Sequence, residues 1–288
     1  MNATTDAPRA ALDARILAAT TERLGISPVQ VVHSTGSTNA DLIDAIVRGQ
    51  AAHLSSLTCE YQSAGKGRLE REWQVPEGAA LTVSIAINPN PALPIPALSW
   101  YTMLAALAWC QAIETQTDLT ASVKWPNDVL LGSRKVCGIL AQLASSTTGP
   151  ALVVGTGMNV DQERAELPVA TATSLRLASG QRISRSELLA SYLSAFHGLD
   201  AAFRAVAGDA GAGLAAYGGK SLRELVAAKL ATLGHWVRIE YPDGTSLEAQ
   251  ALNVAADGAL EVQDAQGGQH RVLAGDVQHV RRSDGQYA

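Results

Sequence analysis

The stretch ASVKWPNDVLLGSRKVCGILAQL, residues 121–143, decides the fold class of this chain. It holds three short apolar runs, residues 121–125, 128–131 and 136–143, which turn-forming residues separate, as is typical of successive β-strands. The tight turn at Gly132 and Ser133 forces the second and third runs to pair as antiparallel neighbours. Because helical segments surround this stretch, the sequence predicts helices packed on a mixed sheet.

Helices and strands alternate on both sides of this stretch. Their periodicity predicts helices over residues 8–25, 37–49, 98–113 and 187–204, and strands over residues 29–34, 57–61, 79–87 and 151–160. Glycine-rich residues 208–219 fit either a linker or a packed loop. The interleaving predicts an α+β or α/β domain.

The pattern changes after residue 233. Short strand-like runs follow at regular spacing, with turn signals at residues 242–244, 257–258 and 267–268. They predict a small β-barrel that packs against the main domain, and a helix over residues 221–233 is predicted to join the two. We therefore divide the chain into an N-terminal helix and extension (1–28), a catalytic domain (29–232) and a C-terminal barrel (233–288).

Composition and charge argue against several classes of protein. The chain has 288 residues, a net charge of −5 and no run of basic residues, so DNA is not an expected partner. It has neither a signal peptide nor an apolar run of 18 residues, which predicts a cytoplasmic protein without a membrane partner. Cys59, Cys110 and Cys137 lie in apolar segments without metal-ligand spacing, and we expect buried free thiols.

The loop QSAGKGRLEREW, residues 62–73, combines two glycines with Lys66, Arg68 and Arg71. Glycine lets the backbone approach a ligand closely, and the basic side chains supply positive charge. The loop therefore predicts an anion-binding site.

Lys124 lies at the end of a strand-like run, immediately before Trp125 and Pro126. The restriction on the residue before proline gives this segment an extended backbone and a fixed turn, which would aim the lysine. Only five lysines occur among 22 basic residues, and three of them fall within residues 60–75 and 122–140. Chemistry that needs a compact ammonium group is one explanation of this clustering. The alternative is a surface lysine on an edge strand.

Together with STGSTNADL, VVGTGMNV and TATSL, these two motifs resemble those of biotin protein ligases. The resemblance covers residues 31–175 and continues more faintly into the C-terminal barrel. The family loop GRGRxGRxW matches residues 65–73 except that Lys66 replaces arginine and Glu70 replaces glycine. KWPND is intact at residues 124–128, and K-x-x-G-I-L matches residues 135–140. The two departures, Lys66 and Glu70, bear on how tightly the reaction intermediate of the family would be held in the site more than on whether the reaction occurs.

The resemblance implies a fold and a reaction. The catalytic domain would resemble that of class II aminoacyl-tRNA synthetases and be followed by an SH3-like barrel. The family joins biotin to ATP, with Mg²⁺ on the phosphates, and passes biotin from biotinyl-5'-AMP to a lysine of a biotin carboxyl carrier protein, a subunit of acetyl-CoA or acyl-CoA carboxylase.

The resemblance also assigns roles to residues. Lys124, Arg68 and Lys66 would be catalytic, and Asp128 would orient Lys124 or contact a metal. The implied biotin contacts are Ser37, Thr38, Asn39, Gln62, Gly65, Lys66, Gly67, Arg68 and Lys124. The implied nucleotide contacts are Arg71, Trp73, Asn127, Lys135 and Asn159. Helix capping is the alternative for residues 37–39, and turn formation is the alternative for Asn159.

Three other functions compete with this interpretation. A lipoate ligase or octanoyltransferase shares the fold, but its RRxxGG-type segment does not occur in this sequence. A biotin-dependent repressor carries a helix-turn-helix before the STN motif, and we expect the monofunctional form because only about 30 residues precede that motif here. A non-catalytic biotin-binding module would need no aimed lysine.

Overall fold

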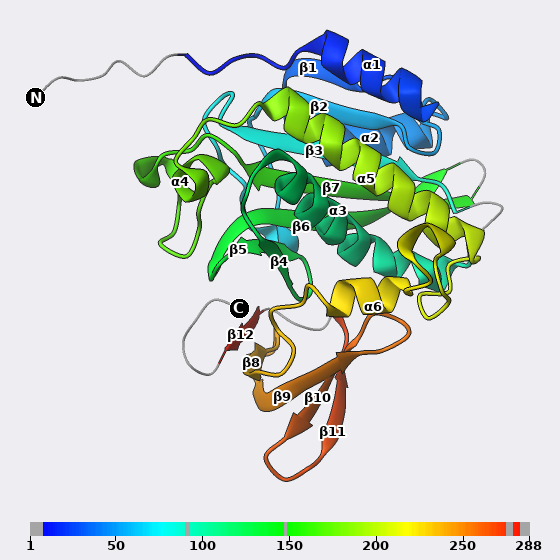
Figure 1. The fold of residues 1–288 in the computed structure, drawn as a ribbon, viewed down its shortest axis with the longest axis vertical. Helices are drawn as coiled ribbons and strands as arrows, with labels where there is room; N and C mark the ends of the chain where they lie inside the picture. Colours follow the sequence, from blue (N-terminus) through cyan, green and yellow to red (C-terminus); the bar gives the residue numbers. More distant parts are fainter. Residues whose placement is uncertain (1–7, 90–92, 147–148, 275–278, 283–288) are drawn as a thin grey trace, which may run out of the picture.

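The computed structural model describes residues 8–89, 93–146, 149–274 and 279–282. Its strands form two sheets, one of seven and one of five strands. Figure 1 shows the larger sheet between helices and the smaller sheet at one end of the molecule. No helix within the described ranges is long and apolar enough to cross a membrane.

The seven-stranded sheet is mixed, as the hairpin sequence predicted. Its order is β1-β2-β3-β7-β6-β5-β4, and only β1 and β2 pair in parallel. The strands are β1 (Gln30–Thr35), β2 (Ser56–Gln62), β3 (Ala80–Ile87), β4 (Ala121–Lys124), β5 (Asp128–Leu131), β6 (Arg134–Ser146) and β7 (Gly149–Asn159). Gly132 has a φ of 59°, which glycine adopts easily, and it turns β5 into β6.

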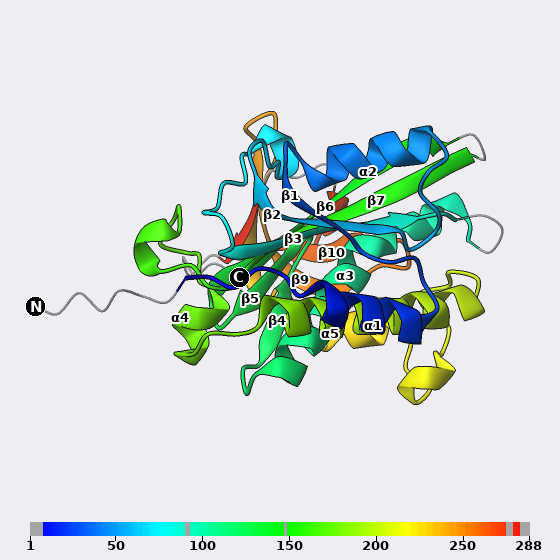
Figure 2. The same cartoon turned by 90° about the horizontal axis from the view of Figure 1, so that it is seen from above.

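Helices cover both faces of this sheet. The helix α2 (Thr38–Val47) covers one face, and α1 (Ala14–Leu24), α3 (Tyr101–Gln116) and α5 (Arg185–Ala205) cover the other (Figure 2). The two short helices are α4 (Leu175–Ser179) and α6 (Leu222–Ala227).

The main core lies between α3, α5 and the sheet. The helix α3 is apolar on nearly every side because α5 and the sheet enclose it. Trp109 stacks on Tyr192 of α5 with ring centroids 3.9 Å apart. Burying large aromatic side chains contributes strongly to stability, so this core holds the strands of the site in a rigid frame.

The first helix is shorter than the predicted span of residues 8–25. It begins at Ala14, where the side chain of Asp13 caps the N–H of Arg15, and it ends at Leu24, with Gly25 as its C-cap. The preceding residues have no regular structure, and other parts of the chain hold their backbone: Arg185 donates to the carbonyl of Ala10 at 2.7 Å, and Leu12 donates to Glu60 at 2.7 Å. Contacts from a distant helix therefore override the helical pattern.

The predicted helix over residues 221–233 is wrong beyond Ala227. Residues 229–232 instead run beside β4: Val123 donates to the carbonyl of Lys229, and Ala231 donates to the carbonyl of Val123, each at 2.8 Å. The glycine-rich residues 208–219 form a packed loop rather than a free linker, since Leu214 is buried. We refer to residues 229–232 as the connector.

The C-terminal residues form an antiparallel sheet with the order β11-β10-β9-β8-β12. Its strands are β8 (Trp236–Glu240), β9 (Ser246–Val254), β10 (Leu260–Asp264), β11 (Gln269–Val272) and β12 (His279–Arg282). Gly244, Gly258 and Gly267 have φ values of 84–86°, so each predicted turn is where the sequence placed it. The three cysteines are free and buried, as expected.

Candidate active site

A cleft of about 310 Å³ lies at the end of the seven-stranded sheet. The start of α2, the end of β2, the loop after β2 and strands β4 to β7 supply its walls. Its lining includes Ser37, Thr38, Asn39, Gln62, Lys66, Gly67, Arg68, Arg71, Trp73, Lys124, Asn127, Asp128, Lys135 and Asn159. The fold thus brings together residues that the sequence separates by more than 100 positions.

Gly65 is the one predicted site residue that does not line this cleft. A Cβ atom at this position would lie 2.4 Å from the carbonyl oxygen of Trp73 and 2.8 Å from Nε2 of Gln62. Real Cβ atoms do not approach other atoms so closely, so glycine is required by the packing of the loop. Its role in this structure is to let two parts of the site meet.

One end of the cleft is a network of uncharged polar side chains. Oγ of Ser84 lies 2.8 Å from Oγ1 of Thr38 and 2.6 Å from Oδ1 of Asn39, and its one proton serves one of these two oxygens at a time. The Nδ2 atom of Asn39 donates to Oε1 of Gln142 at 2.7 Å. Oε1 of Gln62 accepts hydrogen bonds from both the backbone N–H and the hydroxyl of Thr38. These bonds fix the directions of several donors and acceptors before any ligand binds.

The capping alternative for residues 37–39 does not describe these side chains. Ser37 holds the N-cap position of α2, but its side chain makes no capping hydrogen bond. The oxygen of Gln62 reaches the backbone N–H of Thr38 at 2.8 Å and satisfies that helix-end donor instead. Thr38 and Asn39 are buried and face the polar network.

Sequence reasoning missed Ser84 and Gly155. Ser84 is, with Thr82, one of two hydroxyl residues in the otherwise apolar strand β3, and it is fully buried. A Cβ at Gly155 would lie 1.9 Å from Oδ1 of Asn39, so only glycine leaves room for that amide. A buried polar residue or a glycine inside an apolar strand is the signal that could have found them.

Trp73 lies across two glycines of the sheet. A Cβ at Gly157 would be 2.4 Å from Cε2 of the indole, and one at Gly138 would be 3.6 Å from Cζ3. The absence of a side chain at Gly157 therefore leaves room for the indole in the cleft wall, whereas the contact at Gly138 is an ordinary van der Waals distance.

The loop after β2 folds into a small hairpin. Trp73 donates to the carbonyl of Gly65 at 2.8 Å, and Gly67 donates to the carbonyl of Arg71 at 2.6 Å. At its tip, Leu69 has a φ of 54°, a left-handed conformation that costs a residue with a Cβ about 1–2 kcal/mol. We call residues 65–73 the clamp loop.

Arg68 connects the clamp loop to two other parts of the chain. It donates one hydrogen bond to Oδ1 of Asn127 at 3.3 Å and another to the backbone carbonyl of Ala274, beyond β11. Burial lowers the pKa of Arg68, Asp128 opposes that shift and Arg71 adds to it. A partly desolvated guanidinium interacts strongly with an anion in the cleft.

Lys124 ends β4 and is only 4% exposed. The register of β4 and β5 places it opposite Asp128, across the turn that contains the cis peptide bond before Pro126. The carboxylate of Asp128 lies 2.6 Å from the ammonium of Lys135. Lys124 is therefore buried in the cleft wall and is not an exposed surface residue of an edge strand.

Asn159 is the last residue of β7 and is not a turn former. Its Nδ2 donates to the carbonyl of Thr173 at 3.0 Å, and its Oδ1 accepts from Gln162 at 2.8 Å. These bonds tie the end of β7 to the TATSL segment, which explains why both sequences belong to one site.

The described residues offer little to hold a resident metal ion. No group of three histidine, cysteine, aspartate or glutamate side chains with suitable spacing occurs among them. The carboxylate of Asp128, the weak candidate, is paired with Lys135. A protein-held metal centre therefore does not fit these side chains.

Comparison with known proteins gives consistent results. Residues 32–159 match the model of the Biotin/lipoate A/B protein ligase family. The biotin protein ligase of Aquifex aeolicus in complex with biotin and ATP has a similar fold, with a TM-score of 0.72 over 88% of this chain and 99% of that chain at 24% identity.

Two relatives of known name differ in how much of them the chain covers. The bifunctional ligase/repressor BirA of Bacillus spizizenii is 32% identical over 58% of this chain, which spans only 50% of that protein. The biotin--[acetyl-CoA-carboxylase] ligase of Mycobacterium tuberculosis is 32% identical over 89% of this chain and 91% of its own length. With this similarity along nearly the whole chain, and with the family's motifs gathered around one cleft, the protein belongs to the biotin protein ligase family.

Proposed function

We propose that this protein forms biotinyl-5'-AMP from biotin and ATP and transfers the biotinyl group to a lysine of a biotin carboxyl carrier protein. The carrier would be a carboxylase subunit, in keeping with the name of the Mycobacterium tuberculosis relative. One observation carries the proposal: the cleft has an uncharged hydrogen-bonding end and a cationic end. Among its described lining residues, Lys66, Arg68, Arg71, Lys124 and Lys135 are cationic, against two carboxylates.

The uncharged end suits the ureido ring of biotin, which offers two N–H donors and one carbonyl acceptor. Thr38, Asn39 and Gln62 present hydroxyl and amide groups whose directions Ser84 helps to fix. Ser37 also lines the cleft, and we expect it to join them. A preorganised polar network binds without the cost of ordering its own side chains.

The cationic end suits two anions that must react. A carboxylate oxygen of biotin attacks the α-phosphorus of ATP, a P–O bond forms, and the bond to the pyrophosphate leaving group breaks. Lys124, Lys66 and Arg68 would reduce the repulsion between the two anions and stabilise the negative charge that develops around phosphorus, and Gly67, which has no side chain, would let the backbone come close to them. Burial makes the charge of Lys124, and to a smaller degree that of the half-buried Arg68, more effective than it would be in water, whereas Lys66 is exposed.

The nucleotide would lie beyond the carboxylate. We assign Arg71 to the distal phosphates and Trp73 to packing beside the nucleotide, with Asn127, Lys135 and Asn159 as further contacts. Lys135 is held on Asp128 and could exchange that partner for phosphate oxygens. Mg²⁺ enters as part of the MgATP substrate, and no step here depends on a metal site in the protein.

In the second step, the amine of the carrier lysine attacks the carbonyl carbon of the mixed anhydride. A C–N bond forms, AMP leaves, and the amine loses a proton. The clamp loop would shield the anhydride from water until the carrier arrives. Catalysis of this step then rests on holding the two groups in reacting geometry.

The finer structural assignments belong to the same proposal. We expect the C-terminal sheet to close as an SH3-like barrel, the catalytic fold to resemble that of class II aminoacyl-tRNA synthetases, and the domain boundaries to fall near residues 28 and 232. The short connector beside β4 supports the second boundary.

One experiment separates the candidate functions. The protein is mixed with MgATP and either biotin, lipoate or octanoate, and pyrophosphate release and the bound acyl-adenylate are measured, the latter by mass spectrometry. We expect release and an adenylate with biotin only. Adenylation of lipoate or octanoate would identify the related ligases, and biotin binding without pyrophosphate release would identify a binding module.

A further inference from the structure

We propose that the connector and the β9–β10 turn of the C-terminal sheet position Lys124, acting through Thr232 and Trp125. This inference rests on the proposed function because it concerns the lysine assigned to adenylation. Thr232 and Trp125 act here as positioning residues: they hold the backbone that carries the ammonium group.

The connector holds the backbone on both sides of Lys124. Both backbone groups of Val123, its N–H and its carbonyl, bond to residues 229–231 at 2.8 Å. On the other side, the backbone N–H of Trp125 donates to Oγ1 of Thr232 at 3.1 Å. Thr232 is completely buried, so water cannot replace this bond.

The C-terminal sheet adds a second restraint through the indole ring of Trp125. Its Nε1 donates to the carbonyl of Gly258 at 3.1 Å, in the turn between β9 and β10. Gly258 has a φ of 86°, so the turn needs glycine to present its carbonyl in this direction. Figure 1 shows that β9 and β10 reach the main domain below α6, which β9 contacts.

Trp100 makes the same kind of bond to the same turn. Its Nε1 donates to the carbonyl of Ala256 at 2.8 Å, and the neighbouring Ser99 donates to the carbonyl of Asp257 at 2.9 Å. Trp100 and Trp125 are each 1% exposed. They differ in one respect that matters: Trp125 is bonded covalently to Lys124, whereas Trp100 precedes α3 and does not line the cleft.

These contacts have a kinetic consequence. Lys124 must place its ammonium group on oxygens that change position during the attack on phosphorus, and an error of about 1 Å in a reacting geometry can cost up to about 100-fold in rate. Removing one hydrogen bond to Trp125 frees the backbone on only one side of Lys124, so the ammonium group should be displaced by less than 1 Å. We expect about a tenfold loss in the rate of adenylation, with biotin affinity nearly unchanged.

Two matched pairs of variants test the inference in the full-length protein. Thr232→Val removes the acceptor for the Trp125 N–H, and Thr21→Val changes an equally buried threonine in α1, far from the cleft. Trp125→Phe and Trp100→Phe each remove one indole N–H from the same turn. Single-turnover adenylate formation at saturating biotin and ATP gives the rate, calorimetry gives the biotin Kd, and thermal unfolding gives the Tm.

We expect Thr232→Val and Trp125→Phe to slow adenylation about tenfold. The control variants Thr21→Val and Trp100→Phe should adenylate biotin at a rate within twofold of the unchanged protein, although each lowers the Tm about as much as the variant it is paired with. Equal rates within either pair would overturn the inference. If Trp125→Phe does not fold, the threonine pair decides the question. If the unchanged protein forms no adenylate at all, the proposed function itself fails, and this inference fails with it.

Discussion

Replacing Gly155 by alanine should weaken biotin binding without slowing the chemistry of bound substrate. The new Cβ would lie 1.9 Å from Oδ1 of Asn39, where atoms normally stay about 3.5 Å apart, so the amide must move by about 1.5 Å. Gly155 lies in the middle of β7, paired with Ser84 on one side and Leu140 on the other, so the backbone cannot move away.

The cost follows from the bonds that the amide makes. Asn39 accepts from Ser84 at 2.6 Å and donates to Gln142 at 2.7 Å and to the carbonyl of Leu140 at 3.2 Å. Each such bond contributes about 1 kcal/mol net, and the shifted amide can keep some of them. Losing these bonds destabilises the amide in its present position, and if the moved amide also loses one or two bonds to biotin, the cost of about 1–3 kcal/mol corresponds to about a 5- to 150-fold increase in the biotin Kd.

Isothermal titration of biotin into Gly155→Ala measures this loss. Gly198→Ala is the control, since a Cβ there meets only the hydroxyl of Tyr217 at 3.4 Å, away from the cleft. At saturating biotin and ATP, Gly155→Ala should form the adenylate at a rate within a few-fold of the unchanged protein. A Kd within twofold of the control would refute the assignment of Asn39 to the biotin site.

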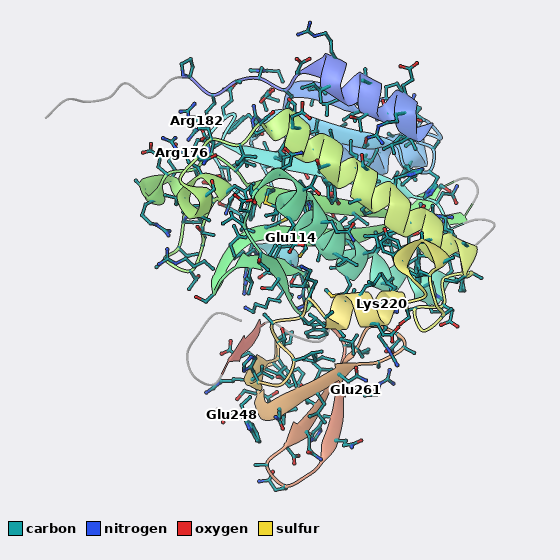
Figure 3. The ribbon with its side chains drawn as sticks, viewed as in Figure 1. Glu114, Arg176, Arg182, Lys220, Glu248 and Glu261 are labelled. Atoms are coloured by element: carbon teal, nitrogen blue, oxygen red, sulfur yellow. The ribbon has the colours of Figure 1, made fainter. Side chains whose placement is uncertain are left out.

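Three further predictions concern the rest of the molecule. Lys124→Ala should slow single-turnover adenylation about 100- to 1000-fold, and Lys124→Arg should recover little of that rate. The control Lys220→Ala, beside α6 in Figure 3, should leave the rate almost unchanged. A wild-type rate in Lys124→Ala would remove this lysine from the mechanism. The clamp loop should be cleaved by protease more slowly once biotin and ATP are added, because its like charges repel until anions bind, and equal cleavage rates would contradict this. Burial raises the pKa of Asp200, but hydrogen bonds and charges from His53, Tyr101 and Arg204 outweigh it and hold that pKa below its ordinary value, so its ionised form stabilises the fold above about pH 4 and this stabilisation is lost as the pH falls further. The difference in unfolding free energy between Asp200→Asn and the unchanged protein, measured by denaturant titration, should therefore be largest near neutral pH and shrink below about pH 4; a difference independent of pH would refute the linkage.

The sequence by itself determined the elements whose signals are local. The turn at Gly132 sets the β5–β6 hairpin, and the glycines at residues 244, 258 and 267 set the turns of the C-terminal sheet, because few other residues adopt a positive φ without strain. The charged and glycine-rich motifs were also readable, because an anion site needs a particular chemistry wherever it lies in the fold.

Only the tertiary structure decided which distant residues pack around the motif residues and hold them in position. Ser84 and Gly155 join the site because β3 and β7 are neighbours in the sheet, which no local pattern reveals. The helix predicted through residue 233 stops at Ala227 because the connector gains backbone hydrogen bonds to the edge strand β4. The restraints on Trp125 come from residues more than 100 positions later in the chain. Such contacts depend on which segments pack together, and the free energy of that packing exceeds the local preferences that the sequence alone displays.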